Sequence, residues 1–352
     1  MNREITYAAA INDAMHVAMR VDESVICYGL GVTDPKGVFG TTIGLEQSFG
    51  SARVFDVPTS ENALLGIAVG ASLAGLKPVV THQRLDFFLL ALDQLVNAAA
   101  KWHYMFGGTT SVPITIRLII GRGWGQGPTH SQNLHAWFSH IPGLKVVMPS
   151  TPGDAKGLLL SSIFDPNPVL FLEHRWLHGS LGSVPPDDYR IPIGVGHVTR
   201  EGSDVTIISH SLMTVEALRA ANYLSKCGIE CNIVDLRTIR PLDWDLVYRC
   251  VESTRRVVVL DSGFSSGSVA GEIIARLAMR FHGQLKCAPV RLAMPDISEP
   301  TSFALTKGFH VTATNVVQKV LEMFGLETKD VEMELAESHP HDVPGPWFKG
   351  PF

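Results

Sequence analysis

The sequence is poor in the features that mark secreted, membrane-spanning and nucleic-acid-binding proteins. Its 352 residues include only five cysteines, an odd number without CxxC spacing, which argues against a disulfide framework and a zinc ribbon. No apolar run approaches the length of a membrane span, and no basic cluster accompanies the net charge of -5. The N-terminus lacks a signal-peptide pattern. We therefore expect a cytoplasmic protein with reduced thiols, or one of the mitochondrial matrix if a transit peptide has been removed.

Motifs for phosphate and dinucleotide binding are also missing. The glycine-rich segment 121–132 has neither the Lys-Ser/Thr ending of a Walker A loop nor the strand–GxGxxG–helix spacing of a dinucleotide fold. What the chain does contain is 45% hydrophobic and 18% charged residues. This composition is typical of a globular protein with a large core, and the length allows two domains.

Alternating strands and helices predict an α/β fold with two parallel-sheet domains. In the first half, strands that are apolar almost throughout alternate with helices, which indicates a parallel sheet covered on both faces. A Gly-, Pro- and Asp-rich segment then predicts a linker, and a second α/β unit follows. We expect a first domain over 1–180, a linker over 181–195, a second domain over 196–328 and a Pro/His-rich tail over 329–352.

Three residues of the first domain are candidates for chemistry. Glu61 stands in the first turn of an apolar helix, where an acid can simply favour the helix dipole or can be a half-buried reactive group. On these residues alone the capping interpretation is preferred. Phe87, like Phe88, favours a core position. His130 follows the glycine-rich loop at a strand end, where α/β sheets place ligands, so it is a candidate ligand or acid–base group.

Several motifs in order resemble one enzyme family. They are Pro58-Thr-Ser-Glu, Leu92-Asp-Gln-Leu-Val-Asn, Thr129-His-Ser-Gln, Pro142-Gly-Leu-Lys-Val-Val-Met-Pro, Asp235-Leu-Arg-Thr-Ile-Arg-Pro-Leu-Asp and Pro295-Asp296. Together they resemble the β subunit of the thiamine-diphosphate-dependent first component of 2-oxo acid dehydrogenases (pyruvate, branched-chain or acetoin type), within the transketolase-like superfamily. The resemblance covers about residues 1–325. It implies an N-terminal pyrimidine-binding thiamine-diphosphate fold followed by a transketolase C-terminal-like domain.

The resemblance implies a role for each candidate. Glu61 matches the carboxylate that hydrogen-bonds the cofactor's aminopyrimidine and activates the cofactor. Phe87 matches the aromatic residue that packs on this ring, with Gln83 and Arg84 beside it as further cofactor-binding residues. His130 matches the histidine that faces the substrate. Such a subunit decarboxylates a 2-oxo acid and passes the acyl group to a lipoyl acceptor.

The resemblance also implies partners and metals. The family holds the diphosphate through Mg²⁺ on a Gly-Asp-Gly…Asn motif that is missing here, and in split members this motif lies on an α subunit. We therefore expect an α2β2 heterotetramer with the active site between chains, and a lipoyl-bearing acyltransferase as a further partner. Asp165 and Asn167 match a structural K⁺ site of some relatives, although an ordinary Asp-Pro-Asn-Pro turn is the preferred interpretation.

Two positions depart from the family pattern. Leu30 replaces a common acid, and Arg84 replaces an aromatic residue near the pyrimidine. Arg84 either binds an anionic substrate or pairs with Asp86, and pairing is preferred. These departures keep open a split transketolase-like carboligase that acts on an aldehyde, and a non-catalytic interaction subunit is a third hypothesis. A metal site at His339 and His341 in the tail is a weaker idea.

Overall fold

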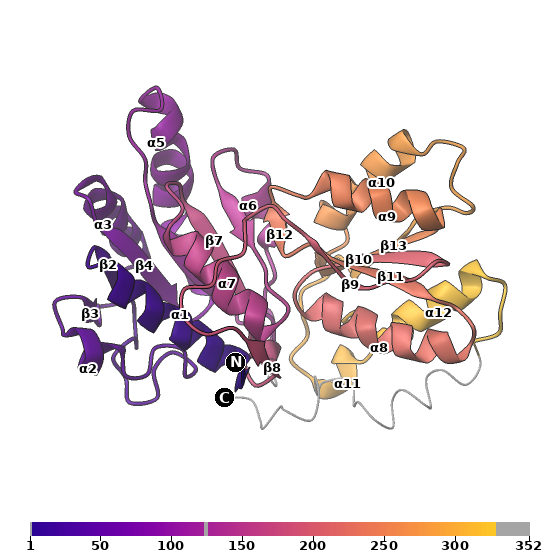
Figure 1. Ribbon diagram of the computed structural model, residues 1–352, viewed down its shortest axis with the longest axis horizontal. Helices are drawn as coiled ribbons and strands as arrows, with labels where there is room; N and C mark the ends of the chain where they lie inside the picture. Colours follow the sequence, from indigo (N-terminus) through magenta and orange to yellow (C-terminus); the bar gives the residue numbers. More distant parts are fainter. Residues whose placement is uncertain (1, 123–125, 329–352) are drawn as a thin grey trace.

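The computed structural model describes residues 2–122 and 126–328 and contains two lobes, each built on its own sheet (Figure 1). The first lobe holds a seven-stranded sheet in the order β12-β6-β7-β5-β4-β2-β3. All its neighbouring strands are parallel except β12, which runs antiparallel to β6. The strands are β2 (Val25–Tyr28), β3 (Val54–Phe55), β4 (Lys77–His82), β5 (Thr115–Ile120), β6 (Lys145–Val147), β7 (Val169–His174) and β12 (Thr238–Arg240).

Helices cover both faces of this sheet, as the apolar strands predict. Successive residues of one strand point to opposite faces, so Cys27 joins the core under α1 (Tyr7–Val21) and α7 (Pro152–Ile163). Ile26 joins the core on the other face, under α3 (Glu61–Leu73). The remaining helical elements of this lobe are α2 (Leu45–Phe49), α4 (Leu85–Phe88), η1 (Leu89–Ala91), η2 (Gln94–Ala99), α5 (Ala100–Met105), α6 (His135–Ser139) and η3 (Arg175–Leu177).

The second lobe has the same design on a smaller scale. Its five-stranded sheet has the order β14-β13-β10-β11-β9, parallel except for β9. The strands are β9 (His197–Arg200), β10 (Val205–Ser209), β11 (Cys231–Asp235), β13 (Val257–Phe264) and β14 (Val290–Met294). The helices are α8 (Leu212–Lys226), α9 (Trp244–Thr254), α10 (Val269–Arg280), α11 (Phe303–Thr306) and α12 (Ala313–Met323), with α8 and α12 on one face and α9 and α10 on the other.

Two short strand pairings extend the first lobe beyond the boundary that the sequence predicts. β8 (Leu181–Val184), in the expected linker, pairs antiparallel with β1 (Arg3–Thr6). β12 belongs by sequence to the second unit but extends the first sheet. Neither strand has a long apolar pattern, and each pairs with a segment far away in the chain, so local periodicity does not reveal them. Within the described ranges no helix has the length and apolarity to cross a bilayer.

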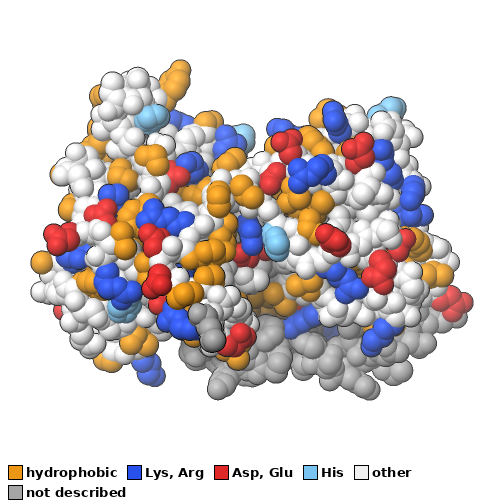
Figure 2. All heavy atoms as spheres, viewed as in Figure 1, with side chains coloured by type: hydrophobic (Ala, Val, Ile, Leu, Met, Phe, Trp, Pro, Cys, Tyr) orange, Lys and Arg blue, Asp and Glu red, His pale blue; other side chains and the backbone are white. Residues whose placement is uncertain are grey.

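A groove of about 1410 Å³ separates α5 and α6 from α9 and α10, at the notch between the lobes in Figure 2. Its lining includes Asn167 but none of Glu61, Phe87 and His130. The groove is therefore distinct from the predicted catalytic residues.

Candidate functional site

The candidate residues follow neighbouring strands of the first sheet. Glu61 comes after β3, Phe87 after β4 and His130 after β5, and these strands are adjacent or separated only by β2. Because the strands are parallel, their carboxyl ends meet at one edge, which is where α/β sheets hold ligands. Folding thus brings three segments that are distant in sequence to the same edge.

Glu61 is half-buried at the start of α3, and its carboxylate makes no hydrogen bond or ion pair with any residue in 2–122 or 126–328. The Ser60 hydroxyl at the N-cap accepts no backbone N–H either. A carboxylate that satisfied the helix end would be expected to accept a backbone N–H. The capping interpretation therefore has no contact to support it, and the carboxylate is available to a ligand.

Tyr28 of β2 contacts the first turn of α3 and holds it in place. Its hydroxyl donates to the Leu64 carbonyl at 2.9 Å, and its ring stacks on Phe55 at 5.2 Å between centroids. Beyond Tyr28 the chain passes so close to β4 that a Cβ on Gly29 would lie 2.0 Å from the Thr81 carbonyl oxygen. Glycine is required there because only it permits this approach. The position of Glu61 thus depends on a rigid strand–helix contact.

The structure brings Phe87 and His130 into contact. Their rings meet edge to face, with centroids 5.2 Å apart and an interplanar angle of 88°. Phe87 is 37% exposed whereas Phe88 is fully buried, so the core interpretation is right for Phe88 and wrong for Phe87. His130 is half-buried, with Nδ1 3.0 Å from the Thr129 hydroxyl. No hydrogen bond or ring contact joins Glu61 to this pair.

Arg84 does not form the expected ion pair with Asp86. Its guanidinium donates to the Gly121 carbonyl at 2.8 Å and to the Gln126 side chain, and it is buried, which lowers its pKa to about 10. Asp86 instead accepts from the Gln132 side chain at 2.8 Å. The two segments of the site therefore hold each other in place, and Arg84 anchors the glycine-rich loop. Gln83 donates to the Leu30 carbonyl at 3.3 Å.

Glu299 is a site residue that the sequence did not reveal. It is buried beside a cleft of about 360 Å³ whose lining also includes Pro128 and Gln132 from the His130 loop. Burial raises the pKa of Glu299 to about 8, with opposing effects from Arg122 and Asp86. Its Oε1 lies 3.0 Å from His310 Nε2. Glu299 comes more than a hundred residues after the loop it approaches, and the Pro295-Asp296 motif that precedes it does not by itself connect it to that loop.

Asp165 and Asn167 form the ordinary turn rather than an open cation site. Asp165 accepts the Asn167 backbone N–H at 2.9 Å and also contacts the Lys145 ammonium group. A K⁺ ion would have to displace this ammonium, so the residues as arranged do not fit the ion. The other weak metal idea, His339 and His341, lies outside the described residues.

Comparisons with known proteins agree with this architecture. The transketolase pyrimidine binding domain matches residues 3–179 and the transketolase C-terminal domain matches residues 194–316. The β subunit of acetoin:2,6-dichlorophenolindophenol oxidoreductase from Cupriavidus necator is 43% identical, with 86% of this chain and 92% of that protein covered. The pyruvate dehydrogenase E1 β subunit of Rickettsia felis is 40% identical over 90% of this chain and 97% of its own.

Two further matches extend the comparison. The 2-oxoisovalerate dehydrogenase β subunit of Bacillus subtilis is 39% identical over 91% of this chain and 98% of its own. A solved structure described as a split gene transketolase, inactive beta4 tetramer, superposes with a TM-score of 0.73, covering 92% of this chain and 99% of that one. At 22% identity it supports the fold alone. The chain belongs to the transketolase-like family of thiamine-diphosphate-dependent 2-oxo acid dehydrogenase E1 β subunits.

Proposed function

We propose that this chain decarboxylates a 2-oxo acid as the β half of a thiamine-diphosphate-dependent dehydrogenase, in an active site completed by an α subunit. The observation that carries the proposal is the unpartnered Glu61 carboxylate at the same sheet edge as the Phe87–His130 pair. The residues fit the cofactor: a half-buried carboxylate for a ring nitrogen, an exposed aromatic face for a ring, and an imidazole for the substrate. Thiamine diphosphate, when bound, supplies an electron sink for decarboxylation.

Each side chain has a defined task in this proposal. Glu61 holds a proton between its carboxylate and the aminopyrimidine nitrogen, in a site from which the partner excludes water. Phe87 orients the ring by packing. His130, whose Nδ1 faces Thr129, has Nε2 left to hold or move a proton at the substrate carbonyl. Arg84 and Asp86 position the His130 loop through Gly121 and Gln132.

The exposed apolar surface near the site supports the need for a partner. Leu30, Ile67 and Leu90 are 42%, 59% and 69% exposed, and Phe87 is also open. Surfaces of this kind usually mark a protein–protein interface. We infer that an α subunit covers them in an α2β2 assembly and contributes the Mg²⁺ site, since the family's magnesium motif is missing from the sequence. A lipoyl-bearing acyltransferase would then accept the acyl group.

The test is reconstitution. The chain is co-expressed with a candidate α subunit and loaded with thiamine diphosphate and Mg²⁺. The complex is then supplied with pyruvate, a branched-chain 2-oxo acid or acetoin. Acetoin is included because one relative is named as an acetoin oxidoreductase subunit. We expect reduction of an artificial electron acceptor that depends on both chains. Turnover by this chain alone would contradict the shared site. Formation of a coupled product from an added aldehyde, without acceptor reduction, would favour the carboligase alternative.

That alternative has lost part of its support. The carboligase alternative was based on two departures from the family pattern, Arg84 and Leu30. The Arg84 guanidinium is buried and donates to Gly121, so it adds no free charge to the pocket. Leu30 is then the only departure that still supports this alternative. The non-catalytic alternative predicts no acceptor reduction with any partner.

A further inference from the structure

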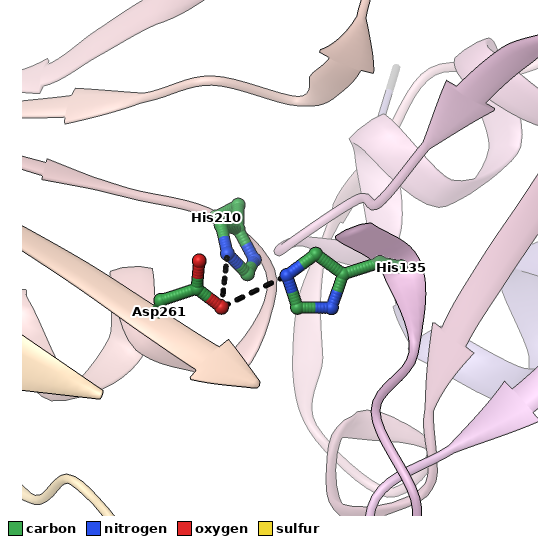
Figure 3. A group of neighbouring side chains, drawn as sticks. All are labelled: His135, His210 and Asp261. Atoms are coloured by element: carbon green, nitrogen blue, oxygen red, sulfur yellow. Dashed lines mark hydrogen bonds and ion pairs between the residues drawn. The ribbon is translucent and has the colours of Figure 1, made fainter. Parts of the chain in front are cut away.

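Three buried side chains meet where the two lobes join (Figure 3). His135 comes from α6 in the first lobe. His210 directly follows β10, and Asp261 lies in β13, the neighbouring strand of the second sheet. From β10 the chain continues to β11 on one side, while β13 lies on the other. Such a switch point in the strand order is where α/β sheets form a ligand crevice, and α6 covers this one.

The geometry is close to that of a metal site. His135 Nε2 and Asp261 Oδ1 are 2.9 Å apart, His210 Nε2 and the same oxygen are 3.9 Å apart, and all three ligand atoms lie within 4.8 Å of one another. Ligands of a tetrahedral Zn²⁺ with bonds of about 2.0–2.1 Å lie about 3.3 Å apart. The imidazole rings are tilted by 64°, so both can direct a nitrogen at a common centre. Small side-chain rotations would close the site.

Several polar atoms of this cluster have no hydrogen-bond partner within residues 2–122 and 126–328. They are both nitrogens of His210 and Nδ1 of His135, although all three side chains of the cluster are at most 1% exposed. The hydroxyls of Ser211 and Ser262, each next in sequence to a cluster residue, are also buried without partners. Leaving such groups unpaired costs about 1–3 kcal/mol each. A bound ion would take His210 Nε2 as a ligand and so give this buried nitrogen the partner that it lacks among the described residues.

The Asp261 carboxylate is already held in place by the backbone around it. It accepts the Gly263 and Ala270 N–H groups at 2.8 and 3.1 Å, an outer shell of the kind that orients metal ligands.

We propose that His135, His210 and Asp261 bind one divalent transition-metal ion, Zn²⁺ by the chemistry of two imidazoles and a carboxylate, at the junction of the lobes. The site is separate from the cofactor edge and from the Mg²⁺ expected on the partner. Its ligands come from both lobes, so the ion stabilises their docking. The competing interpretation is a plain ion pair between His135 and Asp261, with His210 as a neutral neighbour.

The test measures metal in the full-length chain. Protein expressed in zinc-supplemented medium is dialysed and analysed by mass spectrometry, and a sample refolded with Co²⁺ is examined for the visible bands of tetrahedral cobalt. We expect one metal ion per chain, tetrahedral cobalt bands and a melting temperature raised by Zn²⁺. His210→Gln should reduce bound metal at least about tenfold. Because His210 makes no hydrogen bond to any residue that the structure describes, this variant should still fold, as far-UV circular dichroism will check.

Matched controls separate this site from other histidines. His282→Ala removes an exposed imidazole of the same lobe, and His339→Ala/His341→Ala removes the tail pair; both should keep the metal. A wild-type chain with no stoichiometric metal and no tetrahedral cobalt bands would overturn the proposal in favour of the ion pair. Metal that survives His210→Gln but disappears with the tail variant would overturn it as well. None of these readouts depends on catalytic activity.

Discussion

At the residue scale, Glu61 is unusual because it keeps a half-buried carboxylate with no partner at the head of an apolar helix. A group that contributes no contact to the fold can be changed without loss of stability. We therefore expect Glu61→Gln to lower turnover of the reconstituted enzyme by about 10²–10⁴-fold, the usual contribution of a positioned acid–base group. Its melting temperature should be unchanged.

A matched control for this variant exists in α2. Glu46 also stands in the first turn of a helix but is exposed. Glu46→Gln should retain full turnover in the same assay. Equal activity of Glu61→Gln and wild type would refute the catalytic role of Glu61.

Arg84 should behave as a structural residue. Arg84→Leu leaves the Gly121 carbonyl and the Gln126 side chain without their donor. Because the site is buried, we expect the free energy of unfolding to fall by about 1–3 kcal/mol, measured by urea denaturation. Arg249→Leu, at an exposed arginine on α9, should change it by less than about 0.5 kcal/mol. Equal stabilities of these two variants, with altered substrate preference in Arg84→Leu, would restore the substrate-binding interpretation.

The sequence predicted the site at this scale only in part. Glu61 and His130 could be selected as candidates because each has a local context, a helix start and a loop after a strand. The hydrogen-bond partner of Arg84 could not be predicted. Its acceptor Gly121 follows a different strand, and Asp86, the acid close to it in sequence, accepts from Gln132 instead. Phe87 and Phe88 differ only in which side of a short helix they occupy, and no periodicity separates adjacent residues in so short a segment.

At the element scale, α3 has apolar side chains on its exposed face as well as on the face that packs into the core. Leu64, Leu65 and Ala68 pack into the core, while Ile67 remains 59% exposed. We expect Ile67→Lys to weaken association with the α subunit or a second copy of the chain, because a charge on an apolar interface must be desolvated. Size-exclusion chromatography with light scattering measures this directly.

The control for this variant is an exposed apolar residue elsewhere. Met279→Lys changes a side chain on α10 that is 73% exposed, and it should leave assembly intact. An Ile67→Lys chain that assembles like wild type would show that this face of α3 is not an interface.

The long elements of both lobes could be predicted, and the short ones could not. Apolar strands such as β5 and β7 and long helices such as α1 and α8 follow local patterns. The helical segment after β4 is divided into α4, η1, η2 and α5, with a π-helical turn at Gln94–Ala99. This π-helical turn packs against α3, and such a contact between separate elements is not visible in the local sequence pattern.

At the scale of the whole molecule, a buried acid should make stability depend on pH. Asp235, at the end of β11, has its pKa raised from 3.8 to about 7 by burial and by nearby Asp154, which pairs with Arg237 at 2.6 Å. The folded state therefore keeps a proton that the unfolded chain releases. This contribution to stability is complete below about pH 4 and is lost as the pH rises toward 7, at about 1.4 kcal/mol per pKa unit.

Asp235→Asn tests this prediction, because an amide cannot ionise and can still accept the Arg237 N–H. The variant should gain stability relative to wild type between pH 5 and pH 8 in urea titrations. A constant difference between the two proteins across this range would show that Asp235 does not titrate there.

The strand β12 affects how the protein responds to proteolytic cleavage and to unfolding. After the chain has left the first lobe, it returns to add β12 to the first sheet and then goes back to the second lobe. A protease that cut the segment between β8 and β9 would therefore nick the chain without releasing two fragments. We expect a nicked protein to elute as one particle and an intact one to give a single calorimetric transition. Because β12 crosses between them, we expect neither half to fold when it is expressed alone.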